Sequence, residues 1–353
     1  MSTLPLFPAS VVGSMPRPRH VRELIEKPTW DDADHRTMDD AIRYAVSMQE
    51  FAGLDVVTDG EWRRRSYIGV IAELAHGFTL EVNPADGRPW TVVTDKLAPK
   101  EGGFIAAEAK FLKSVARVGT KITLPAPALL GERLWDAQRS KKAYPRREDF
   151  VRDCVAPLRR EIELIQKLGV DIVQIDDPHL CLFVDPDIRR NYDDPDRAAD
   201  FAVDMINALV EGFTGIKFAV HLCRRAGARV RGEKHHAGAY GWILPQLNRL
   251  NVQHLTMEFT VAGDDDLESL GRLREDFEVG LGVVDVTPGA HEQPEHITAR
   301  VERALRKVDA GRITLNPDCG FAPGSAAKVD LDEVYLKLRA EAEAARMLRA
   351  RHG

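Results

Sequence analysis

The chain has few cysteines and lacks any long hydrophobic run. It has four cysteines in 353 residues, too few for a disulfide framework in a chain of this size, which favours a reducing compartment. No segment approaches the roughly eighteen uninterrupted apolar residues that a membrane-spanning helix needs. The N-terminal MSTLPLFPASVVGS also lacks the basic stretch followed by a long apolar one that marks a signal peptide. We therefore expect a cytoplasmic protein without a membrane partner.

An excess of basic residues is absent as well. Lysine and arginine number 49 against 55 aspartate and glutamate residues, which gives a formal net charge of −6. A mildly acidic chain offers no positive surface on which nucleic acid or an anionic membrane would gather. Hydrophobic residues make up 44% of the chain, enough at this length to bury a full core. The composition predicts a globular protein whose partners are small molecules.

Short apolar runs typical of buried strands alternate along the chain with segments of helical periodicity. Strict alternation implies parallel strands with right-handed crossovers, and eight such units at this length favour a closed barrel. We therefore predict a single (β/α)8 TIM barrel domain over residues 1–353. A doubly wound open sheet would need a switch point and a phosphate loop, which the sequence does not offer. The expected strands are residues 11–13, 54–57, 122–124, 171–175, 218–220, 252–257, 280–284 and 313–315.

Helix signals and turn residues define the segments between these strands. The first helix is expected to begin with a capping signal at Thr37 and Asp40 and to end at Gly53. Residues 77–103 interrupt the alternation of strands and helices. Their alternating apolar and polar residues around turn residues predict a β-hairpin-like excursion on the catalytic rim after the second strand. Further helices are expected at about 147–168, 197–213, 242–250, 267–277, 294–308 and 331–349.

Four residues that can bind a metal ion lie at or just past the ends of expected strands: His221, Cys223, Glu258 and Cys319. Two thiolates, an imidazole and a carboxylate form a complete tetrahedral shell for zinc, a borderline-soft ion that accepts sulfur, nitrogen and oxygen together. The tips of parallel strands converge, and His221 and Cys223, two positions apart, lie on the same side of their strand. The sequence therefore predicts a Zn²⁺ site.

Other polar residues follow the expected strands in the same way. Ser14 follows the first strand, Glu61 the second, Asp176 and Asp177 the fourth, and Asp285 the seventh. Barrels of this kind keep their active sites at the carboxyl ends of their strands. We therefore expect the chemistry of this protein at that end.

The candidate metal ligands and their neighbours also have explanations without function. A single cysteine or histidine is more often a packing residue, and Cys154 and Cys181 are expected to be core or surface thiols. A salt bridge to an arginine would explain Glu258 in its apolar run, because an unpaired buried carboxylate is costly. The adjacent His235 and His236 look like a second ligand pair but are expected to face solvent.

The acidic residues have simple alternatives too. Asp176 and Asp177 stand before Pro178 and could form only a turn. Glu61 stands before Trp62 and three arginines and could form a solvated ion pair.

Seven motifs occur along the chain: VVGSMPRP, DVVTDGEWRR, VQIDDPHL, HLC, MEF, GVVDV and NPDCGFAP. In this order and spacing they resemble the C-terminal catalytic barrel of the cobalamin-independent methionine synthase family, over almost the whole chain. The resemblance implies a (β/α)8 barrel and a zinc ion held by the four residues named above. It also implies a homocysteine site formed by Ser14, Glu61 and Asp176.

The implied chemistry needs these residue types. A free thiol is mostly protonated at neutral pH, and coordination by zinc would remove that proton to leave a sulfur nucleophile. Glu258, the hardest ligand, is the natural one to yield its place to the incoming sulfur. Glu61 and Asp176 would act as catalytic residues by pairing with the substrate ammonium group. The methyl group would then pass to sulfur by direct displacement, as in a 5-methyltetrahydropteroyltriglutamate–homocysteine S-methyltransferase.

The chain departs from the family at three points. Full-length members have an additional N-terminal barrel that helps to bind polyglutamylated folate, whereas this chain has one barrel. The QIDEP motif of the family ends here with Asp177 in place of glutamate before the proline. Thr287 stands where the family places a catalytic histidine, a candidate proton donor to the pterin, and His291 is the nearest substitute. The methyl donor is therefore a methyl-folate or another carrier such as methylcobalamin, free or protein-bound.

Two alternatives stay open at this point. QIDDP and HLCR also resemble epoxyalkane:coenzyme M transferases, in which a zinc-bound thiolate opens an epoxide, and cationic residues placed for a sulfonate would favour that activity. A catalytically silent barrel that keeps zinc for structure, or serves as a partner subunit, would have four protein ligands and no exchangeable position. An intact pocket at Ser14, Glu61 and Asp176 favours homocysteine.

Overall fold

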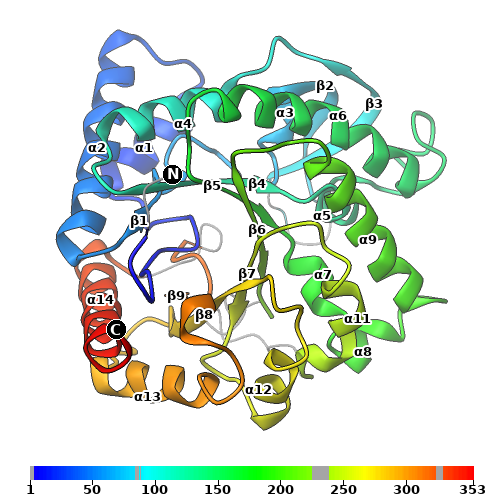
Figure 1. Ribbon diagram of the computed structural model, residues 1–353. Helices are drawn as coiled ribbons and strands as arrows, with labels where there is room; N and C mark the ends of the chain where they lie inside the picture. Colours follow the sequence, from blue (N-terminus) through cyan, green and yellow to red (C-terminus); the bar gives the residue numbers. More distant parts are fainter. Residues whose placement is uncertain (1–3, 84–86, 88, 225–237, 323–328) are drawn as a thin grey trace.

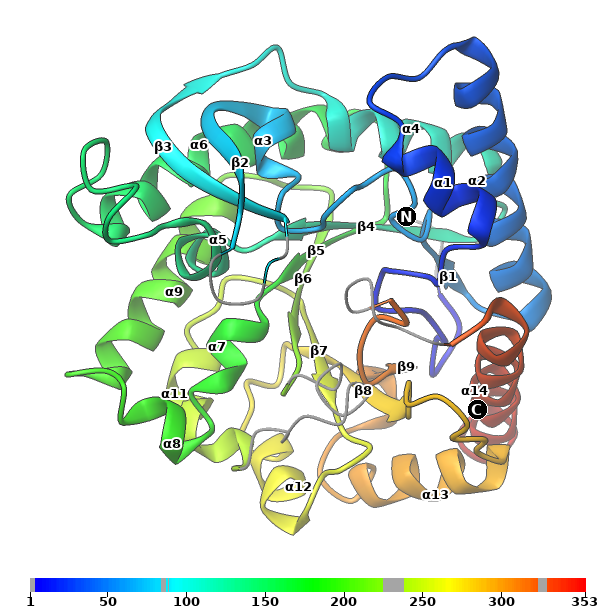
Figure 2. The same cartoon turned by 180° about the vertical axis from the view of Figure 1, so that it is seen from behind.

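The computed structural model describes residues 4–83, 87, 89–224, 238–322 and 329–353. At its centre is a seven-stranded sheet in which all neighbouring strands are parallel. Figures 1 and 2 view the molecule from opposite sides and show the helices arranged around these strands. In sheet order the strands are β1 Val56–Val57, β4 Gly119–Pro125, β5 Ile172–Asp176, β6 Lys217–Leu222, β7 His254–Glu258, β8 Glu278–Val284 and β9 Ile313–Pro317.

A short N-terminal segment closes the sheet into a barrel. Ala9 forms a parallel bridge to Leu315 of β9, and the next residue, Ser10, forms one to Val56 of β1. The segment therefore lies between the two edge strands in the place of a first strand. The predicted (β/α)8 barrel is confirmed, with a first strand reduced to these bridges.

This first strand does not lie where the sequence predicts it. The prediction is residues 11–13, but the bridges lie before them and residues 11–13 are not in a strand. Gln174 Nε2 donates a hydrogen bond to the Val12 carbonyl at 3.0 Å, and Thr58 Oγ1 donates one to the Gly13 carbonyl at 2.7 Å. Because side chains satisfy these buried carbonyl groups, the segment can leave the strand ladder there. The other seven predicted strands are confirmed, with ends that differ by a few residues.

The first long helix, α2 (Asp32–Ala52), begins earlier than the sequence predicts. Its N-cap is Asp31, whose side chain accepts hydrogen bonds from backbone N–H groups of the first turn, and Asp34 completes a capping box. The predicted cap at Thr37 is wrong, because that residue lies inside the helix and its hydroxyl donates to a carbonyl one turn back. An aspartate caps as well as a threonine and also complements the helix dipole. Gly53, with φ of 98°, ends the helix as predicted.

The predicted hairpin-like excursion is confirmed. β2 (Ala75–Val82) and β3 (Pro89–Pro99) form a separate antiparallel pair after β1. The pair packs on α6 (Arg147–Gln166), where the rings of Phe78 and Phe150 meet edge to face with 6.1 Å between centroids. Figure 1 shows the pair outside the ring of barrel strands, beside α3 (Ile71–Leu74) and α6.

The remaining helices follow the predicted alternation with two changes. The segment predicted as one helix at 242–250 is a 3₁₀ turn followed by a short α-helix, and the helix predicted at 267–277 ends at Leu270. Helix α14 packs against α2, so the last helix lies beside the first long one (Figure 1). The bounds are α1 Arg19–Glu26, α3 Ile71–Leu74, α4 Phe104–Val115, α5 Pro127–Leu134, α7 Pro178–Leu182, α8 Pro186–Arg189, α9 Pro195–Val210, η1 Tyr240–Ile243, α11 Leu244–Leu247, α12 Asp264–Leu270, α13 Pro294–Ala304, η2 Ala310–Arg312 and α14 Leu331–His352.

The amino end of the barrel is covered by the first described residues. Residues 4–8 lie beside the starts of β5, β6, β8 and β9 and line a cavity of about 300 Å³. This cavity is lined mainly by apolar residues and by the ion pair of Lys217 with Glu278, whose closest atoms are 2.6 Å apart. The predicted site residues lie at the opposite, carboxyl end of the strands. Among the described residues, no helix has the length and apolar character needed to cross a membrane.

Candidate active site

Three of the four predicted metal ligands come together at the carboxyl end of the barrel. His221 lies in β6, Cys223 directly follows β6, and Cys319 follows β9. One ligand atom from each lies within 4.8 Å of the others, and all three residues are buried. The two Sγ atoms are 3.5 Å apart. Two thiolates bound to one zinc ion would lie about 3.8 Å apart, given tetrahedral geometry and Zn–S distances of about 2.3 Å, so this separation fits the ion.

The surroundings of His221 also fit a metal ligand. Its Nδ1 lies 3.1 Å from Asp176 Oδ1, which also accepts a hydrogen bond from Gln174 Nε2 at 2.8 Å. Its Nε2 is buried and makes no hydrogen bond within the described part of the chain. Histidines that bind a metal through one ring nitrogen usually donate the other N–H to a carboxylate, which fixes the orientation of the ring.

Without a metal ion these groups hold their protons tightly. Burial lowers the pKa of His221, but interactions with the Asp176 carboxylate and the Cys223 sulfur outweigh burial and raise this pKa to about 9. Contact with Cys223, together with burial, raises the pKa of the Cys319 thiol well above its usual value. A divalent cation would compete with these protons for the same lone pairs. A set of two sulfur donors and one nitrogen donor is typical of zinc.

Glu258, the fourth predicted ligand, lies near this group, and its charge acts on the Cys319 thiol. It is buried at the end of β7, and its Oε2 accepts a hydrogen bond from the backbone N–H of Arg224 at 2.8 Å. The guanidinium group of Arg224 in turn binds Asp266 at 3.0 Å and the Glu258 carbonyl at 3.1 Å. These contacts hold the chain that directly follows Cys223, and so help to place that thiol.

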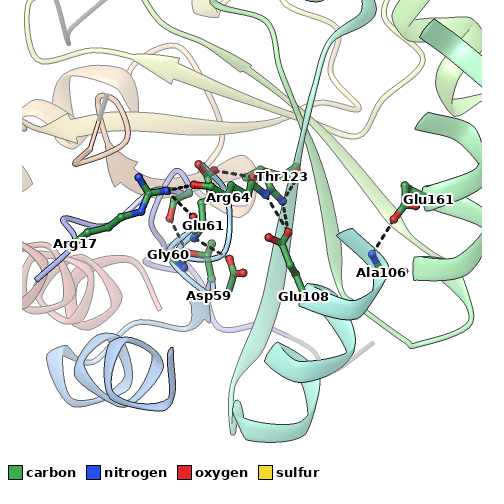
Figure 3. Close-up of polar contacts among 11 residues, drawn as sticks. Arg17, Asp59, Gly60, Glu61, Arg64, Ala106, Glu108, Thr123 and Glu161 are labelled. Atoms are coloured by element: carbon green, nitrogen blue, oxygen red, sulfur yellow. Dashed lines mark hydrogen bonds and ion pairs between the residues drawn. The ribbon is translucent and has the colours of Figure 1, made fainter. Parts of the chain in front are cut away.

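Glu61 is buried in the turn after β1. It is 6% exposed, which rules out the solvated ion pair that the sequence allowed. Its Oε1 accepts a hydrogen bond from Thr123 Oγ1 at 2.7 Å (Figure 3). Burial raises the pKa of its carboxyl group. The backbone has φ of 60° at Glu61, a left-handed conformation that is uncommon for a residue with a side chain. Strained residues of this kind cluster at functional sites.

The predicted pocket residues and the metal group form one connected region. Asp176 contacts His221 directly, and its charge acts on the Glu61 carboxyl group. Ser14 packs against the segment after Cys319: its Oγ accepts a hydrogen bond from the Ala322 N–H at 3.3 Å. A Cβ atom at position 320 would lie 2.3 Å from that Oγ, so the glycine there allows the close approach.

Asp177 and Thr287, the two departures from the family motifs, have structural roles here. Asp177 is fully buried, and its Oδ1 caps α7 by accepting the Leu180 N–H at 2.8 Å. Thr287 donates its N–H to Asp285 Oδ1 at 2.8 Å and accepts Lys337 Nζ at its carbonyl at 2.7 Å. The candidate substitute in this loop, His291, is exposed. The cap at Asp177 confirms the turn before Pro178 that the sequence allowed as an explanation without function.

Cys154 and Cys181 are not among the three grouped metal-binding residues. Cys154 in α6 and Cys181 in α7 are both free and buried, so each is a core thiol, and burial raises the pKa of both. The predicted pair His235 and His236 falls outside the described residues.

Sequence reasoning missed several groups that surround Glu61. Arg64 and Glu108 form an ion pair with 2.8 Å between Nη2 and Oε2, and both side chains are 1% exposed. Thr123 on β4 joins this pair to Glu61. Tyr67 is a further phenol near the metal group: burial raises its pKa, and charges at Asp176 and the two thiols act in the same direction. The run of three arginines resembled a solvated surface segment, and no local pattern showed that one of them is buried.

Comparisons with known proteins place the chain in a family. The model of the cobalamin-independent synthase catalytic domain matches residues 7–98 and 133–347. A methionine synthase from Saccharolobus islandicus (strain L.S.2.15 / Lassen #1) is 30% identical over 333 residues, which cover 91% of this chain and 90% of that protein. One from Sulfurisphaera tokodaii is 27% identical over 334 residues, covering 91% and 88%.

A solved structure has the same fold. It is a B12-independent methionine synthase from Shewanella sp. W3-18-1 in complex with selenomethionine, with a TM-score of 0.78 and 23% sequence identity over 98% of this chain and 99% of that one. The family model spans most of the chain and includes both halves of the barrel that carry the buried histidine, thiols and carboxylates. The chain belongs to the cobalamin-independent synthase family, and it is a methyltransferase.

Proposed function

We propose that this protein is a zinc-dependent thiol S-methyltransferase that converts homocysteine to methionine. The observation that carries the proposal is the buried group of His221, Cys223 and Cys319, in contact with a carboxylate that can receive an amino group. Archaeal relatives named methionine synthases align with this chain over nearly their whole length, which supports methionine synthesis by a chain of this size.

The metal would be held by His221, Cys223 and Cys319. Bound zinc supplies a positive charge that keeps the sulfur of a thiol substrate deprotonated and therefore nucleophilic at neutral pH. Three protein donors leave one position of a tetrahedral shell for that sulfur, as in catalytic zinc sites. Glu258, adjacent to this group, is the fourth ligand that we propose for the state without substrate, and its bond to the Arg224 N–H keeps it nearby after displacement.

The chain itself would hold the amino-acid part of the substrate. Glu61 and Asp176 offer two buried carboxylates to one ammonium group, and Ser14 adds a hydroxyl beside the segment that follows Cys319. Two buried anionic groups attract a cation and repel a sulfonate. This charge favours homocysteine over coenzyme M, and so argues against the epoxide-opening alternative. The position that Glu258 would yield to the substrate sulfur is exchangeable, and a silent barrel that keeps zinc only for structure would not need such a position.

The methyl donor would be a methyl-folate or another carrier such as methylcobalamin, free or bound to a partner protein. A pterin leaving group needs a proton, and the family histidine that could supply it is Thr287 here. General-acid help is worth about a hundredfold to ten-thousandfold in rate. We therefore favour a donor that departs without protonation. The four cysteines, all free, support our proposal of a reducing, cytoplasmic location.

An assay of methionine formation tests the function and the donor together. Zinc-loaded protein is incubated with homocysteine and, separately, methyltetrahydrofolate, its polyglutamate form or methylcobalamin. We expect methionine with at least one donor, fastest with methylcobalamin, and none from the matched Cys319→Ser variant. Absence of methionine with every donor, from protein shown to hold zinc, would contradict the proposed function. Rapid use of monoglutamyl folate would contradict only the preference for donor.

A further inference from the structure

A buried chain of hydrogen bonds runs from α4 to the Glu61 carboxylate. Glu108 Oε2 accepts from Nε and Nη2 of Arg64 at 2.9 and 2.8 Å. Nη1 of Arg64 lies 2.9 Å from Thr123 Oγ1, which lies 2.7 Å from Glu61 Oε1. Figure 3 shows the four side chains in this sequence. All four residues are buried, so water does not compete for these bonds.

The chemistry of the donors fixes the direction of each bond. A guanidinium group can only donate, so Thr123 Oγ1 accepts from Arg64. The single hydroxyl hydrogen of Thr123 then has Glu61 Oε1 as its acceptor. Arg64 polarises that hydroxyl toward the carboxylate, and hydrogen bonds to ionised groups are stronger than neutral ones. The arrangement occupies Oε1 and leaves Oε2, which makes no hydrogen bond within the described residues, for a ligand.

The backbone keeps the carboxylate in this place. Arg17 Nη2 donates to the carbonyl groups of Glu61 and Arg64 at 2.8 and 2.6 Å, which holds the left-handed turn at Glu61. A Cβ atom on Gly13 would lie 2.6 Å from Glu61 Oε1 and 2.9 Å from Thr123 Cγ2. The carboxylate is therefore enclosed between a glycine and the threonine, and its conformation is set before any ligand arrives.

A purely structural ion pair would not need the Thr123 hydroxyl. Arg64 Nη2 also donates to the Thr123 carbonyl at 2.8 Å. That bond and the pair with Glu108 attach the turn to β4 whatever side chain stands at position 123. The bond from Arg64 to Thr123 Oγ1 is not needed for that attachment, and it connects Arg64 to the Glu61 carboxylate through the Thr123 hydroxyl.

We propose that Thr123 is a positioning residue that sets the preference of this site for ligands with an α-ammonium group. Its hydroxyl holds Glu61 Oε1, so that Oε2 is directed to the ammonium group of the amino acid. This inference rests on the proposed function, in which Glu61 binds that ammonium group.

Binding of two ligands to matched variants tests the proposal. Zinc-loaded wild-type protein, Thr123→Val and Thr123→Ser are titrated by calorimetry with methionine and with 4-(methylthio)butanoate, which lacks the ammonium group. Thr123→Val should bind methionine roughly tenfold to a hundredfold more weakly, the effect of losing one hydrogen bond to a charged group. Thr123→Ser keeps the hydroxyl and should resemble the wild type. Affinity for the butanoate should be the same in all three proteins.

Other outcomes would overturn the assignment. Unchanged methionine affinity in Thr123→Val, or equal losses for both ligands, would remove the specific role of the hydroxyl. If wild-type protein binds both ligands equally, the ammonium site of the proposed function is absent and the role of Thr123 is refuted with it. Zinc content and near-ultraviolet circular dichroism check that each variant is folded. If Thr123→Val does not fold, Thr123→Ala, which also lacks the hydroxyl, replaces it in the same titrations.

Discussion

At the scale of single residues, the Asp176 carboxylate links the candidate metal group to the amino-acid pocket. Its Oδ1 lies 3.1 Å from His221 Nδ1 and accepts a second hydrogen bond from Gln174 at 2.8 Å. A carboxylate behind a ligating histidine orients the ring and raises its affinity for metal. In the proposed function the Asp176 carboxylate also binds the ammonium group of the amino-acid substrate. One side chain therefore couples the binding of metal and of substrate.

This coupling predicts different effects for the two acidic residues of the pocket. Asp176→Asn should weaken methionine binding and also lower zinc affinity by about tenfold to a hundredfold, because it changes the partner of His221. Glu61→Gln, the matched control, should weaken methionine binding and leave zinc affinity unchanged. Competition with a zinc chelator measures the metal affinity, and calorimetry measures methionine binding. Equal zinc affinity in both variants would show that Asp176 does not support the metal group.

The thiols give the sharpest test of the metal itself. Wild-type protein should hold about one zinc ion per chain, and Cys223→Ser or Cys319→Ser should lose most of it, because a hydroxyl is a poor replacement for a thiolate on this ion. Cys154→Ala changes a core thiol of α6 and should keep its zinc. Elemental analysis of the purified proteins gives the result. Full zinc content in both serine variants would leave the proposed centre without support.

At the scale of elements, capping decides where α2 begins. Asp31 and Asp34 cap each other's backbone N–H groups, whereas Thr37 sits inside the helix with its hydroxyl bonded to Ala33. This helix packs against α14 and α4, on the side of the barrel where the N-terminal bridges close the sheet.

Removal of the N-cap should destabilise the protein in a measurable way. Asp31→Ala should lower the free energy of unfolding by about 1 kcal/mol, the usual value of an N-cap side chain. Thr37→Ala should have little effect, because an alanine is favourable inside a helix. Urea denaturation followed by circular dichroism compares the two variants with the wild type. The reverse order of effects would restore Thr37 as the signal that starts the helix.

At the scale of the whole molecule, the barrel interior contains buried charge as well as apolar side chains. Burial lowers the pKa of His254 in β7 to about 3, with a smaller effect in the same direction from Lys121 and Lys217. Burial also lowers the pKa of Lys121 in β4 to about 8. His254 Nε2 lies 3.0 Å from Thr314 Oγ1, so the neutral ring has a partner on β9, two strands away in the sheet. The interior therefore favours a neutral imidazole.

This burial predicts a loss of stability in acid. The folded pKa of His254 lies below its unfolded value of 6.5, so protons bind preferentially to the unfolded state between these limits. The contribution of the buried neutral His254 to the free energy of unfolding is complete above about pH 6.5. It falls as the pH drops toward 3, by about 1.4 kcal/mol per pH unit. The free energy of unfolding of the wild type should therefore approach that of His254→Gln between pH 6.5 and 5. A difference that does not change with pH would contradict the prediction.

The sequence by itself determined the order of the elements, the end of the barrel at which the candidate site lies and the identity of the candidate metal donors. Periodicity reports which face of a segment is buried, and the tips of parallel strands must converge. His221, Cys223 and Cys319 could be grouped for that reason, although 96 positions separate the two thiols. The same reasoning placed Glu61 and Asp176 near them without giving their contacts.

Only the tertiary structure decided how these side chains are paired. The bond of Glu258 to Arg224, that of Asp176 to His221 and the path from Arg64 through Thr123 to Glu61 all depend on the packing of neighbouring strands in the sheet. A hydrogen bond depends on distances of a few tenths of an ångström and on the direction of each donor. Local sequence patterns specify burial and secondary structure, so such distances are fixed only when the strands and helices pack.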